Sequence, residues 1–487
     1  MRMRSAFQGD MAPTLATRLD RLRRLSQMTM RYAQDIIEAI SADFGNRSPH
    51  ETLIADLLSV DESIKHARSH LRRWMRPRRM PTGFKYRPGY NRLMAQPVGV
   101  VGVVAPWNYP YQLSMLPTVA ALAAGNRVMI KPSELTPKTS DLMARLVQES
   151  FGDDEVAVFP GDAALGKAFV ELPFDHLFFT GSTAVGRLVA QAAAKNLTPV
   201  TLELGGKSPV IIDAEGDFGR IAPLVAIGKL FNAGQTCIAP DYALVPRARV
   251  DEFAVAMTRA VATLFPTLAG NRDYASIVNE RHYARLAGLL ADARSHGARI
   301  VEINPAGEAL PATARKMAPT LLLDVGDEMT IMRDEIFGPL LPVVAYDSLD
   351  DALRYVNRHD RPLALYWFGN NSSRCDRVLR NTIAGGVTVN GCLTHFAQEA
   401  QPFGGVGASG SGAYHGEYGF RTFSKEKAVF YQSRHGLVPL LLPPYGKLLE
   451  AVMAWYARGT RRRAFESRPA GQAAGSVHNR EKIGGNE

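Results

Sequence analysis

The sequence predicts an α/β fold with two doubly wound parallel-sheet domains. From Met94, short β-branched runs alternate with helical stretches, and a second alternating series begins near Pro209. Strand, helix and strand in repetition are typical of a parallel sheet covered by helices on both faces. A chain of 487 residues also exceeds the size at which one hydrophobic core keeps growing. We therefore expect two packed α/β units, 98–204 and 205–401, with no low-complexity linker between them.

The segment that precedes the first unit predicts a layer of helices. Residues from about Thr14 to Met75 carry apolar side chains at helical spacing, as in LIADLLSVDESIKHARSHL. An amphipathic helix buries its apolar stripe against a neighbour, so we expect the layer at 1–76 to pack on a later part of the chain.

Composition excludes several classes of protein. Hydrophobic residues make up 46% and charged residues 21% of the chain, an ordinary balance for a globular protein. The formal charge is +10, with arginines concentrated in LRRWMRPRR and RGTRRR, but no RNA-binding motif or zinc-finger spacing accompanies them. We interpret these runs as solvated surface or subunit contacts and expect no nucleic-acid partner. The three cysteines, an odd number in a long chain, favour reduced thiols.

The termini predict a cytoplasmic location. The first residues lack the apolar core of a signal peptide, and no run is long and uncharged enough for a membrane-spanning helix. The closest candidate lies in 436–465, where three prolines interrupt the apolar run. We expect 436–465 to be a helical extension packed on the protein body, with peripheral membrane contact as the alternative. The polar tail, 466–487, is expected to be flexible.

The first candidate for chemistry is Cys237 in NAGQTCIAP, where small and polar neighbours leave the sulfur uncrowded. A reactive cysteine needs a favourable pKa and access, and a lone cysteine is more often an inert small hydrophobe. Both interpretations stay open on this residue alone.

Two further motifs present polar side chains at the ends of apolar runs. In TLELGGKSP, Glu203 ends a strand and is followed by two glycines that permit a chain reversal. A carboxylate there can act as a base that activates water, or it can be a surface side chain in a turn. In APWNYPYQLS, two prolines fix the backbone around Asn108, whose amide can donate to a developing oxyanion. Lys207, after the glycines, is interpreted as a surface charge.

Two strand ends suit a dinucleotide. DHLFFTGSTAVGRLVAQ predicts strand, glycine-containing turn and helix, so that a pyrophosphate can bind at the helix amino terminus, although GxGxxG is absent. NRVMIKPSE ends another strand with polar groups suited to ribose hydroxyls. An ordinary strand-to-helix connection and a solvated loop are the alternatives. The candidate cofactor-binding residues in the two turns are Lys131, Ser133, Glu134, Gly181, Ser182 and Gly186.

Seven motifs in this order resemble the aldehyde dehydrogenase superfamily from Val98 to about Val429. They are APWNYP, IKPSE, FTGSTAVG, LELGGKSP, GQTCIAP, DEIFGP and PFGGVGASGSG. The pairing of Glu203 with Cys237, 34 residues later, is among the most specific elements. GQTCIAPDY looks most like the class 3 branch. The opening text SADFGNRSPHETLIAD, with HLRRWMRPRR, is similar to bacterial coniferyl aldehyde dehydrogenases.

This resemblance implies NAD(P)-dependent oxidation of an aldehyde to a carboxylic acid through a thiohemiacetal and a thioester on Cys237. Asn108 and the backbone N–H of Cys237 would stabilise the oxyanion, and Glu203 would activate the water that hydrolyses the thioester. The family pattern assigns Glu335 to the nicotinamide ribose and Phe337 to the side of the nicotinamide ring. No metal site is expected.

The resemblance also implies how the cofactor is chosen and held. Lys131 and Glu134 would bind the adenosine ribose, and Ser182 would bind the pyrophosphate. Because Glu134 would repel a 2′-phosphate, NAD is the expected cofactor, with NADP as the alternative that class 3 relatives often accept.

Domain roles follow from the same resemblance. Residues 1–76 and 98–204 would form a Rossmann-like NAD(P)-binding domain, and 205–401 a catalytic domain. Residues 77–97 and 402–435 would form a small bridging and oligomerisation β element, so a homodimer is expected.

Several alternatives stay open at this point. Coniferyl or another aromatic aldehyde is the first expected substrate, and medium to long aliphatic aldehydes are the second. A cofactor-free thiol esterase, a non-catalytic protein on the same fold, and an enzyme that passes the thioester to coenzyme A are the rival functions. His395 is interpreted as structural, with proton transfer as the alternative. Cys375 and Cys392 are interpreted as structural.

Overall fold

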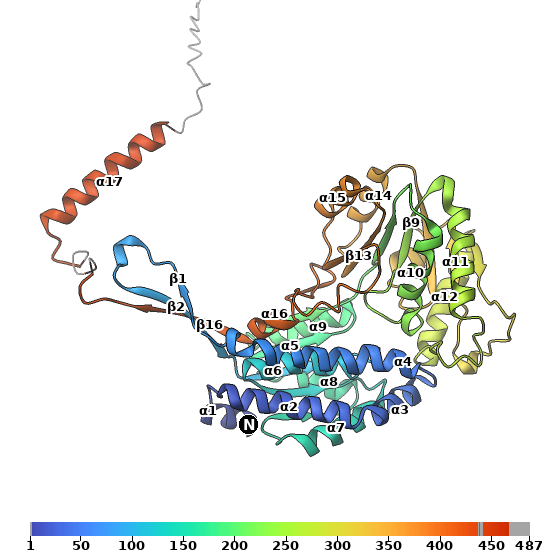
Figure 1. The fold of residues 1–487 in the computed structure, drawn as a ribbon, viewed down its shortest axis with the longest axis horizontal. Coiled ribbons are helices and arrows are strands. Elements are labelled where there is room, and N and C mark those ends of the chain that lie inside the picture. Colours follow the sequence, from blue (N-terminus) through green and yellow to red (C-terminus); the bar gives the residue numbers. More distant parts are fainter. Residues whose placement is uncertain (1, 437, 439–441, 467–487) are drawn as a thin grey trace, which may run out of the picture. The chain divides into compact units, whose positions relative to one another are not determined.

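The computed structural model describes residues 2–436, 438 and 442–466 of the chain (Figure 1). The chain divides into two units, one made of 1–76 with 94–427 and the other of 77–93 with 428–487. Nearly all of the predicted tail, 466–487, lies outside the described residues. Both predicted parallel sheets lie in the first unit, so the α/β prediction is confirmed.

The first sheet has six strands in the order β15-β7-β6-β3-β4-β5. β15 is antiparallel to β7, and the other five strands are parallel. The winding reverses between β3 and β6, because β4 and β5 extend the sheet on one side and β7 on the other. Ligands of doubly wound sheets bind at such a switch point, beyond the carboxyl ends of the strands. The bounds are β3 Val100–Val104, β4 Arg127–Lys131, β5 Val156–Val158, β6 His176–Thr180, β7 Val200–Glu203 and β15 Gly410–Ser411.

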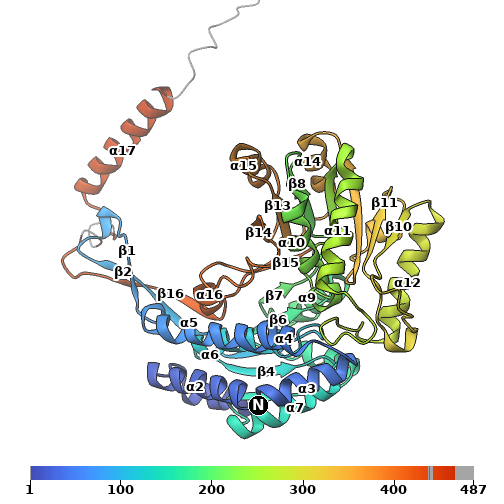
Figure 2. The same ribbon diagram turned by 45° about the vertical axis from the view of Figure 1, so that its right-hand side comes forward.

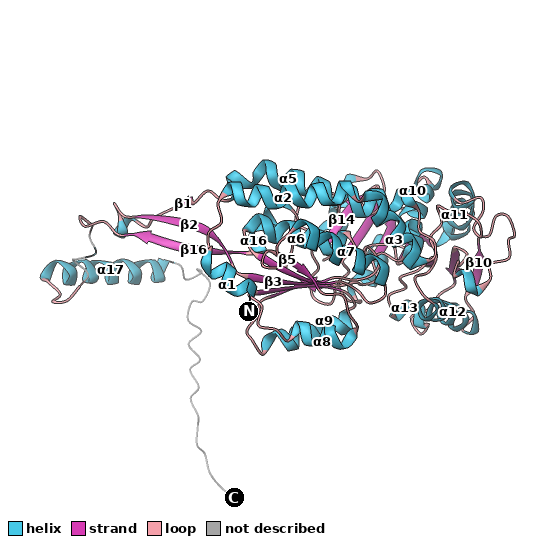
Figure 3. Cartoon of the chain, turned by 90° about the horizontal axis from the view of Figure 1, so that it is seen from below, coloured by secondary structure: helices cyan, strands magenta, loops and turns pink. Residues whose placement is uncertain are grey.

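Helices cover both faces of this sheet (Figure 3). One face carries α6 Gln112–Ala124 and α7 Pro137–Ser150, and the other carries α8 Ala163–Val170 and α9 Thr183–Ala194. Every residue of α6 is buried. A helix that is apolar all round needs cover on all sides, and the N-terminal helices supply it.

That N-terminal layer is helical, as its periodicity predicts. α2 and α5 pack on α6, and α3 packs on α7. Between α4 and α5 the chain forms a π-helical turn, η1 Leu53–Leu58, a rare geometry that is frequent at functional sites. The bounds of the helices are α1 Arg2–Gly9, α2 Leu15–Arg31, α3 Ala33–Phe44, α4 Pro49–Thr52 and α5 Ser59–Trp74.

The second sheet has seven strands in the order β10-β11-β12-β9-β8-β13-β14. β10 is antiparallel to β11, and the rest are parallel. Figure 2 shows α10 and α11 side by side along this sheet. The strands are β8 Pro209–Ile212, β9 Tyr242–Pro246, β10 Arg299–Glu302, β11 Thr320–Leu323, β12 Leu340–Tyr346, β13 Ala364–Phe368 and β14 Gly386–Val389. The helices are α10 Phe218–Leu230, α11 Val250–Leu264, α12 Glu280–Ser295, α13 Thr330–Arg333, α14 Leu349–Asn357 and α15 Ser372–Asn381.

A third sheet has three strands in the order β1-β2-β16. Parts of both chain segments of the second unit, 77–93 and 428–487, belong to this sheet. It consists of β1 Arg78–Met80, β2 Tyr90–Pro97 and β16 Ser424–Tyr431, and the rings of Tyr90 and Tyr431 stack with their centroids 4.6 Å apart. The helix α17 Lys447–Glu466 follows. Among the described residues, none of the helices has the length and apolar character needed to cross a bilayer.

The segment predicted as bridging, 402–435, is divided between the two units. β15 pairs with β7, and α16 Gly416–Thr422 packs on α5 and α6, so this part belongs to the first unit. The sequence did not predict this division because β15 and β7 are far apart in the chain, and local patterns do not reveal such a pairing. The functional names given to the predicted domains stay predictions.

Candidate active site

Three of the predicted site residues follow neighbouring strands of the first sheet. Asn108 comes shortly after β3, Ser182 comes after β6, and Glu203 is the last residue of β7. β3 pairs with β6, and β6 pairs with β7, all in parallel. Their carboxyl ends therefore meet at the same edge, next to the switch point between β3 and β6.

Cys237 reaches this edge from the second sheet. After α10 the chain turns through Phe231–Gly234, where Asn232 and Ala233 have positive φ angles of 53° and 52°. A Cβ atom at Gly234, whose φ is +77°, would collide with the carbonyl of Gly338. This tight turn requires glycine at that position and carries the chain to Cys237, which is half-buried.

The Asn108 side chain is fixed against the turn that precedes Cys237. It is buried, and its Nδ2 donates to the carbonyl of Gln235 over 3.1 Å. The carbonyl of Asn108 itself accepts from Asn232 Nδ2 over 3.1 Å. One N–H of the Asn108 amide is thus committed to the backbone, which leaves a second N–H for another acceptor.

The Glu203 carboxylate is buried at the end of β7. Both of its oxygens are buried and lack a hydrogen-bond partner among the described residues. Burial raises the pKa of Glu203 well above its ordinary value. A buried acceptor left without partners is costly, so this carboxylate calls for an explanation in function, and a water that donates to it would supply one.

Two carboxylates raise the pKa of the Cys237 thiol. Burial, then Glu335 and Glu203, raise the pKa of Cys237 to about 12. A negative charge near a thiol favours the neutral thiol, so both carboxylates oppose formation of the Cys237 thiolate. The three groups form one electrostatically coupled cluster.

Glu335 lies directly over the reversal that follows β7. A Cβ atom at Gly205 would collide with the Glu335 carboxylate, which explains why glycine is needed there. Burial and Asp241 raise the pKa of Glu335 to about 7, although a hydrogen bond from the Gly206 backbone opposes the shift.

The interpretation of Lys207 as a surface charge is wrong. Its side chain is 12% exposed and forms an ion pair with Asp241. Its Nζ also donates to the carbonyls of Ile331 and Asp334, over 2.8 and 2.9 Å. Lys207 therefore ties the reversal after β7 to the segment that carries Glu335, a role that charge alone does not indicate.

Phe337 is half-buried and adopts a positive φ of 50°. Its ring meets the ring of Trp107 edge to face, with centroids 5.3 Å apart. Arg285 donates to the carbonyls of Glu335 and Ile336 and so holds the main chain that leads into Phe337. The structure thus brings Phe337 next to the turn that carries Asn108.

The turn predicted to bind the pyrophosphate leads into the amino terminus of α9. Ser182 is exposed and caps α9 by accepting from Val185 N over 3.4 Å. Gly181 lies between β6 and this cap. A Cβ atom at Gly186 would come within 2.6 Å of the Leu204 side chain, so α9 approaches the sheet more closely than a larger residue allows. A pyrophosphate fits at such a helix amino terminus.

The turn after β4 offers two charged groups. The Lys131 ammonium donates to the carbonyl of Pro132 over 2.7 Å and lies 3.7 Å from the carboxylate of Glu134, which is exposed. The Ser133 hydroxyl accepts from Leu135 N over 3.2 Å and orders the turn. An ammonium and a carboxylate side by side suit the hydroxyls of a ribose.

The ring of His395 lies among aromatic side chains, with its centroid 6.1 Å from that of Tyr366 and 6.0 Å from that of Phe403. Its Nδ1 is 2.8 Å from Thr388 Oγ1, and burial lowers the pKa of His395 to about 4. The imidazole is therefore neutral near pH 7, which fits the structural interpretation. Cys392 and Cys375 are free thiols, and burial raises the pKa of both. Within the described ranges, no cluster of histidine, cysteine, aspartate or glutamate side chains fits a metal ion.

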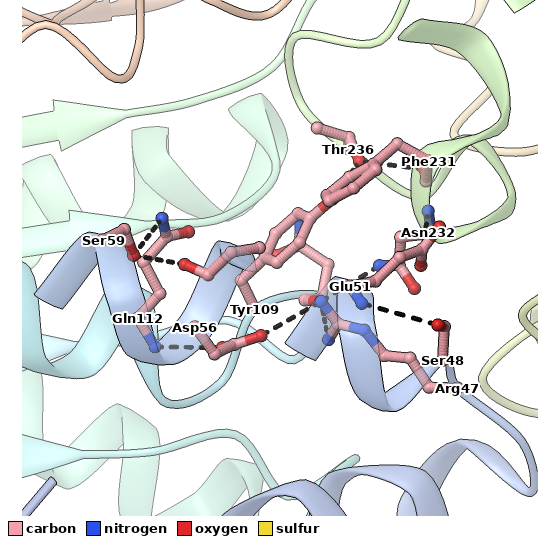
Figure 4. A network of polar contacts seen from close by, with 12 residues as sticks. Arg47, Ser48, Glu51, Asp56, Ser59, Tyr109, Gln112, Phe231, Asn232 and Thr236 are labelled. Carbon is pink, nitrogen blue, oxygen red and sulfur yellow. Dashed lines mark hydrogen bonds and ion pairs between the residues drawn. The ribbon is translucent and has the colours of Figure 1, made fainter. Parts of the chain in front are cut away.

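Sequence reasoning missed the buried ion pair of Arg47 and Asp56, which Figure 4 shows close to Tyr109. The side chains of Arg47 and Asp56 are completely buried, 3.0 Å apart, and Arg47 donates to the carbonyl of Asn108 over 2.9 Å. Both residues lie in the motif SADFGNRSPHETLIAD. The motif is similar to a known family, but nothing in its local pattern indicates that these two charged side chains are buried.

The chain matches known proteins along almost its whole length. Residues 2–429 match the model of the aldehyde dehydrogenase family. The probable coniferyl aldehyde dehydrogenase of Caulobacter vibrioides is 48% identical over 93% of this chain and 95% of its own. The coniferyl aldehyde dehydrogenase of a Pseudomonas species is 47% identical over 93% and 94%. Aldehyde dehydrogenase family 3 member A2 of Pongo abelii is 38% identical over 91% and 90%.

Solved structures agree with these relatives. The substrate-bound AldH of Staphylococcus aureus has a TM-score of 0.87 and 37% identity, and covers 93% of this chain and 98% of its own. The indole-3-acetaldehyde dehydrogenase of P. syringae, in complex with NAD+ and IAA, has a TM-score of 0.81 and 26% identity, over 89% and 88%. The predicted resemblance and fold class are confirmed. The chain therefore belongs to the aldehyde dehydrogenase family and is an NAD(P)-dependent oxidoreductase that acts on the aldehyde group.

Proposed function

We propose that this enzyme oxidises an aromatic aldehyde of the coniferyl type to its acid, with NAD as the preferred cofactor and Cys237 as the nucleophile. One observation carries the site assignment: the Asn108 amide is bonded to the turn before Cys237, and the buried Glu203 carboxylate, without a hydrogen-bond partner among the described residues, raises the pKa of that thiol. The names and coverage of the relatives support the substrate class.

In the first half-reaction, the sulfur of Cys237 bonds to the aldehyde carbon. The thiol first loses its proton to solvent, since the thiolate is the nucleophile. The carbonyl oxygen becomes an oxyanion, which accepts hydrogen bonds from the Asn108 amide and the backbone N–H of Cys237. The chemistry that bound NAD would supply at this point is an acceptor for the hydride on this carbon. The carbon and the sulfur are then joined as a thioester.

In the second half-reaction, Glu203 accepts a proton from a water molecule as that water attacks the thioester. The C–S bond breaks, the acid leaves, and the Cys237 sulfur recovers a proton. The raised pKa of Glu203 makes its carboxylate a stronger base than an exposed glutamate. The same two N–H groups bind the oxyanion of this step.

The dinucleotide would bind across the edge of the first sheet. Ser182, with Gly181 and Gly186, would receive the pyrophosphate at the start of α9, and Lys131, Ser133 and Glu134 would receive the adenosine ribose. Glu335 would bind the nicotinamide ribose, and Phe337 would lie beside the ring. The exposed helix start, the close packing at Gly186 and the Lys131–Glu134 pair support this fit.

A homodimer and a cytoplasmic location also belong to the proposal. The strands β1 and β16 expose most of their residues, including the aromatic side chains of Phe430 and Tyr431. Exposed strands with aromatic side chains are typical of surfaces that pair with a second subunit.

The test is a comparison of kcat/KM for coniferyl aldehyde with a series of alkanals from C4 to C16, each with NAD and with NADP. We expect coniferyl aldehyde with NAD to be favoured by about tenfold or more, the discrimination that a fitted pocket provides. A preference for long alkanals would replace the aromatic assignment with the aliphatic alternative. Ester cleavage without aldehyde-dependent growth of reduced cofactor would instead support the thiol esterase, and a requirement for coenzyme A would support the acylating enzyme.

A further inference from the structure

Arg47 is a fully buried cation that no step of the proposed chemistry uses. It follows α3 and is covered by aromatic rings, with its guanidinium 4.6 Å from the ring centre of Tyr109 and 5.3 Å from that of Phe44. Asp56, in the π-helical turn, is its partner across 3.0 Å. Burial of two such charges has a desolvation cost that their attraction often only offsets, so stability alone is a weak reason for the pair.

The ion pair holds both ends of the turn that carries Asn108. Arg47 Nη1 donates to the carbonyl of Asn108 over 2.9 Å. Asp56 Oδ1 accepts from the backbone N–H of Gln112, the first residue of α6, over 3.1 Å. The four residues from Asn108 to Tyr111 are thus bracketed between the cation and the anion of one pair.

The segment 47–56, which contains both members of the ion pair, also contacts the turn before Cys237. The carboxylate of Glu51 accepts from the backbone N–H of Asn232, over 3.1 Å, where that turn begins. Asn232 Nδ2 shares the Asn108 carbonyl with Arg47. The ring of Tyr109, under the Arg47 guanidinium, places its hydroxyl 2.7 Å from Thr236 Oγ1, one residue before the cysteine.

We propose that Arg47 and Asp56 form a positioning clamp that sets the Asn108 amide against Cys237. The inference rests on the proposed role of Asn108 as an oxyanion donor. Arg47 and Asp56 touch neither substrate nor sulfur; they act through Asn108. An oxyanion donor is effective only where it is already directed at the developing charge, so a small shift of the turn reduces the rate of acylation.

Two variants separate positioning from stability. Arg47→Lys keeps the positive charge, but an ammonium cannot span the Asn108 carbonyl and the Asp56 carboxylate as the guanidinium fork does. The double variant Arg47→Met with Asp56→Asn removes both charges and leaves an acceptor for the Gln112 N–H. Arg21→Lys is the matched control, because Arg21 forms a buried ion pair with Glu155, over 2.9 Å, far from this turn.

Three measurements are made on each folded protein. The first is the rate of the pre-steady-state burst of reduced NAD, which reports acylation. The second is the rate of alkylation of Cys237 by iodoacetamide, followed by mass spectrometry of its peptide, which needs no oxyanion donor. The third is the effect of Arg47→Lys in an Asn108→Ala background, because residues that act through one another are not additive.

We expect both clamp variants to acylate at least about tenfold more slowly, since misplacement by about 1 Å can cost about 100-fold. Alkylation of Cys237 should stay within about twofold of wild type, and Arg47→Lys should have no further effect once Asn108 is alanine. Arg21→Lys should acylate at the wild-type rate.

Wild-type acylation in a folded Arg47→Lys protein would overturn the clamp, and so would an undiminished loss in the Asn108→Ala background. If the double variant does not fold, the Arg47→Lys cycle alone decides between these outcomes. Wild-type acylation by Asn108→Ala itself would overturn the oxyanion role and the clamp together, which distinguishes the two failures.

Discussion

The Asn108 amide donates to the main-chain carbonyl of Gln235 across 3.1 Å, a hydrogen bond between residues 127 positions apart. It joins the turn after β3 of the first sheet to the turn between α10 and β9 that precedes Cys237. The amide therefore cannot move independently of the thiol's own backbone.

Replacing Asn108 with alanine should lower kcat by about 100-fold to 1000-fold, the usual loss when one oxyanion donor is removed. The KM for NAD should change little, because the side chain does not lie in either cofactor turn. Burst kinetics with a saturating aldehyde measure the effect. Asn357→Ala is the control, since Asn357 also donates to a backbone carbonyl, that of Asn381, over 2.8 Å at an exposed site. Equal rates in the two variants would remove Asn108 from the mechanism.

Replacing Glu203 with glutamine should preserve the first-turnover burst and abolish most of the steady-state rate, because the amide cannot accept a proton from water. Quenched-flow assays and intact-mass detection of the acyl-enzyme measure both phases. Cys237→Ala should abolish the burst as well. Normal steady-state turnover by Glu203→Gln would show that another group activates the water.

Neutralising Glu335 should make Cys237 more reactive towards iodoacetamide. Burial is the main cause of the raised pKa of Cys237, and the charge of Glu335 adds to it. Glu335→Gln removes that negative charge, so the thiol pKa falls and more thiolate is present at any pH below it. Alkylation rates between about pH 7 and pH 10 show the shift. Glu302→Gln, at an exposed position of β10, should leave the profile unchanged, and a shift to higher pH in Glu335→Gln would contradict the assignment.

A methyl group at Gly186 should weaken NAD binding. It would meet Leu204 at 2.6 Å and push α9 away from the sheet, which we expect to destabilise the protein by about 1–3 kcal/mol, as overpacking does. The KM for NAD should rise more than kcat falls. Gly288→Ala is the control, since a Cβ there has open space within α12 and should stabilise the helix by up to about 1 kcal/mol. Thermal unfolding and NAD titrations compare the two, and an unchanged KM in Gly186→Ala would separate α9 from the cofactor.

Replacing Glu134 with glutamine should improve the use of NADP. Its exposed carboxylate repels a 2′-phosphate, an interaction worth about 1 kcal/mol at about 4 Å in bulk water and thus about fivefold in kcat/KM. The ratio of kcat/KM for NADP to that for NAD measures the change. Glu171→Gln is the matched control, because Glu171 forms a similar exposed pair with Lys195, 3.6 Å away. A ratio that moves equally in both variants would indicate a general charge effect.

Much of the fold follows from local patterns. The runs that predict strands before Asn108, Lys131 and Ser182 are β3, β4 and β6, because a buried parallel strand needs continuous apolar side chains. Polar residues at their ends therefore identified the sheet edge that carries the candidate site.

Local sequence patterns could not predict the contacts between residues that are far apart in the chain. Arg47 and Asp56 look like ordinary charges of an amphipathic segment, and their burial depends on how α6 and the Asn108 turn pack over them. Lys207 becomes half-buried because Asp241 and two carbonyls converge on it from other elements. In each case the neighbours that decide the environment lie tens of residues away.

The two-residue strand β15 has a consequence for handling the protein. It covers the outer edge of β7, with Gly410 paired to Glu203 and Ser411 to Leu202. An uncovered strand edge is a template for pairing with another chain. Gly410 has a φ of +142° and approaches the Leu202 carbonyl so closely that a side chain would displace it. Substitutions at Gly410 should therefore cause aggregation during expression, and libraries that vary the site should leave this position untouched.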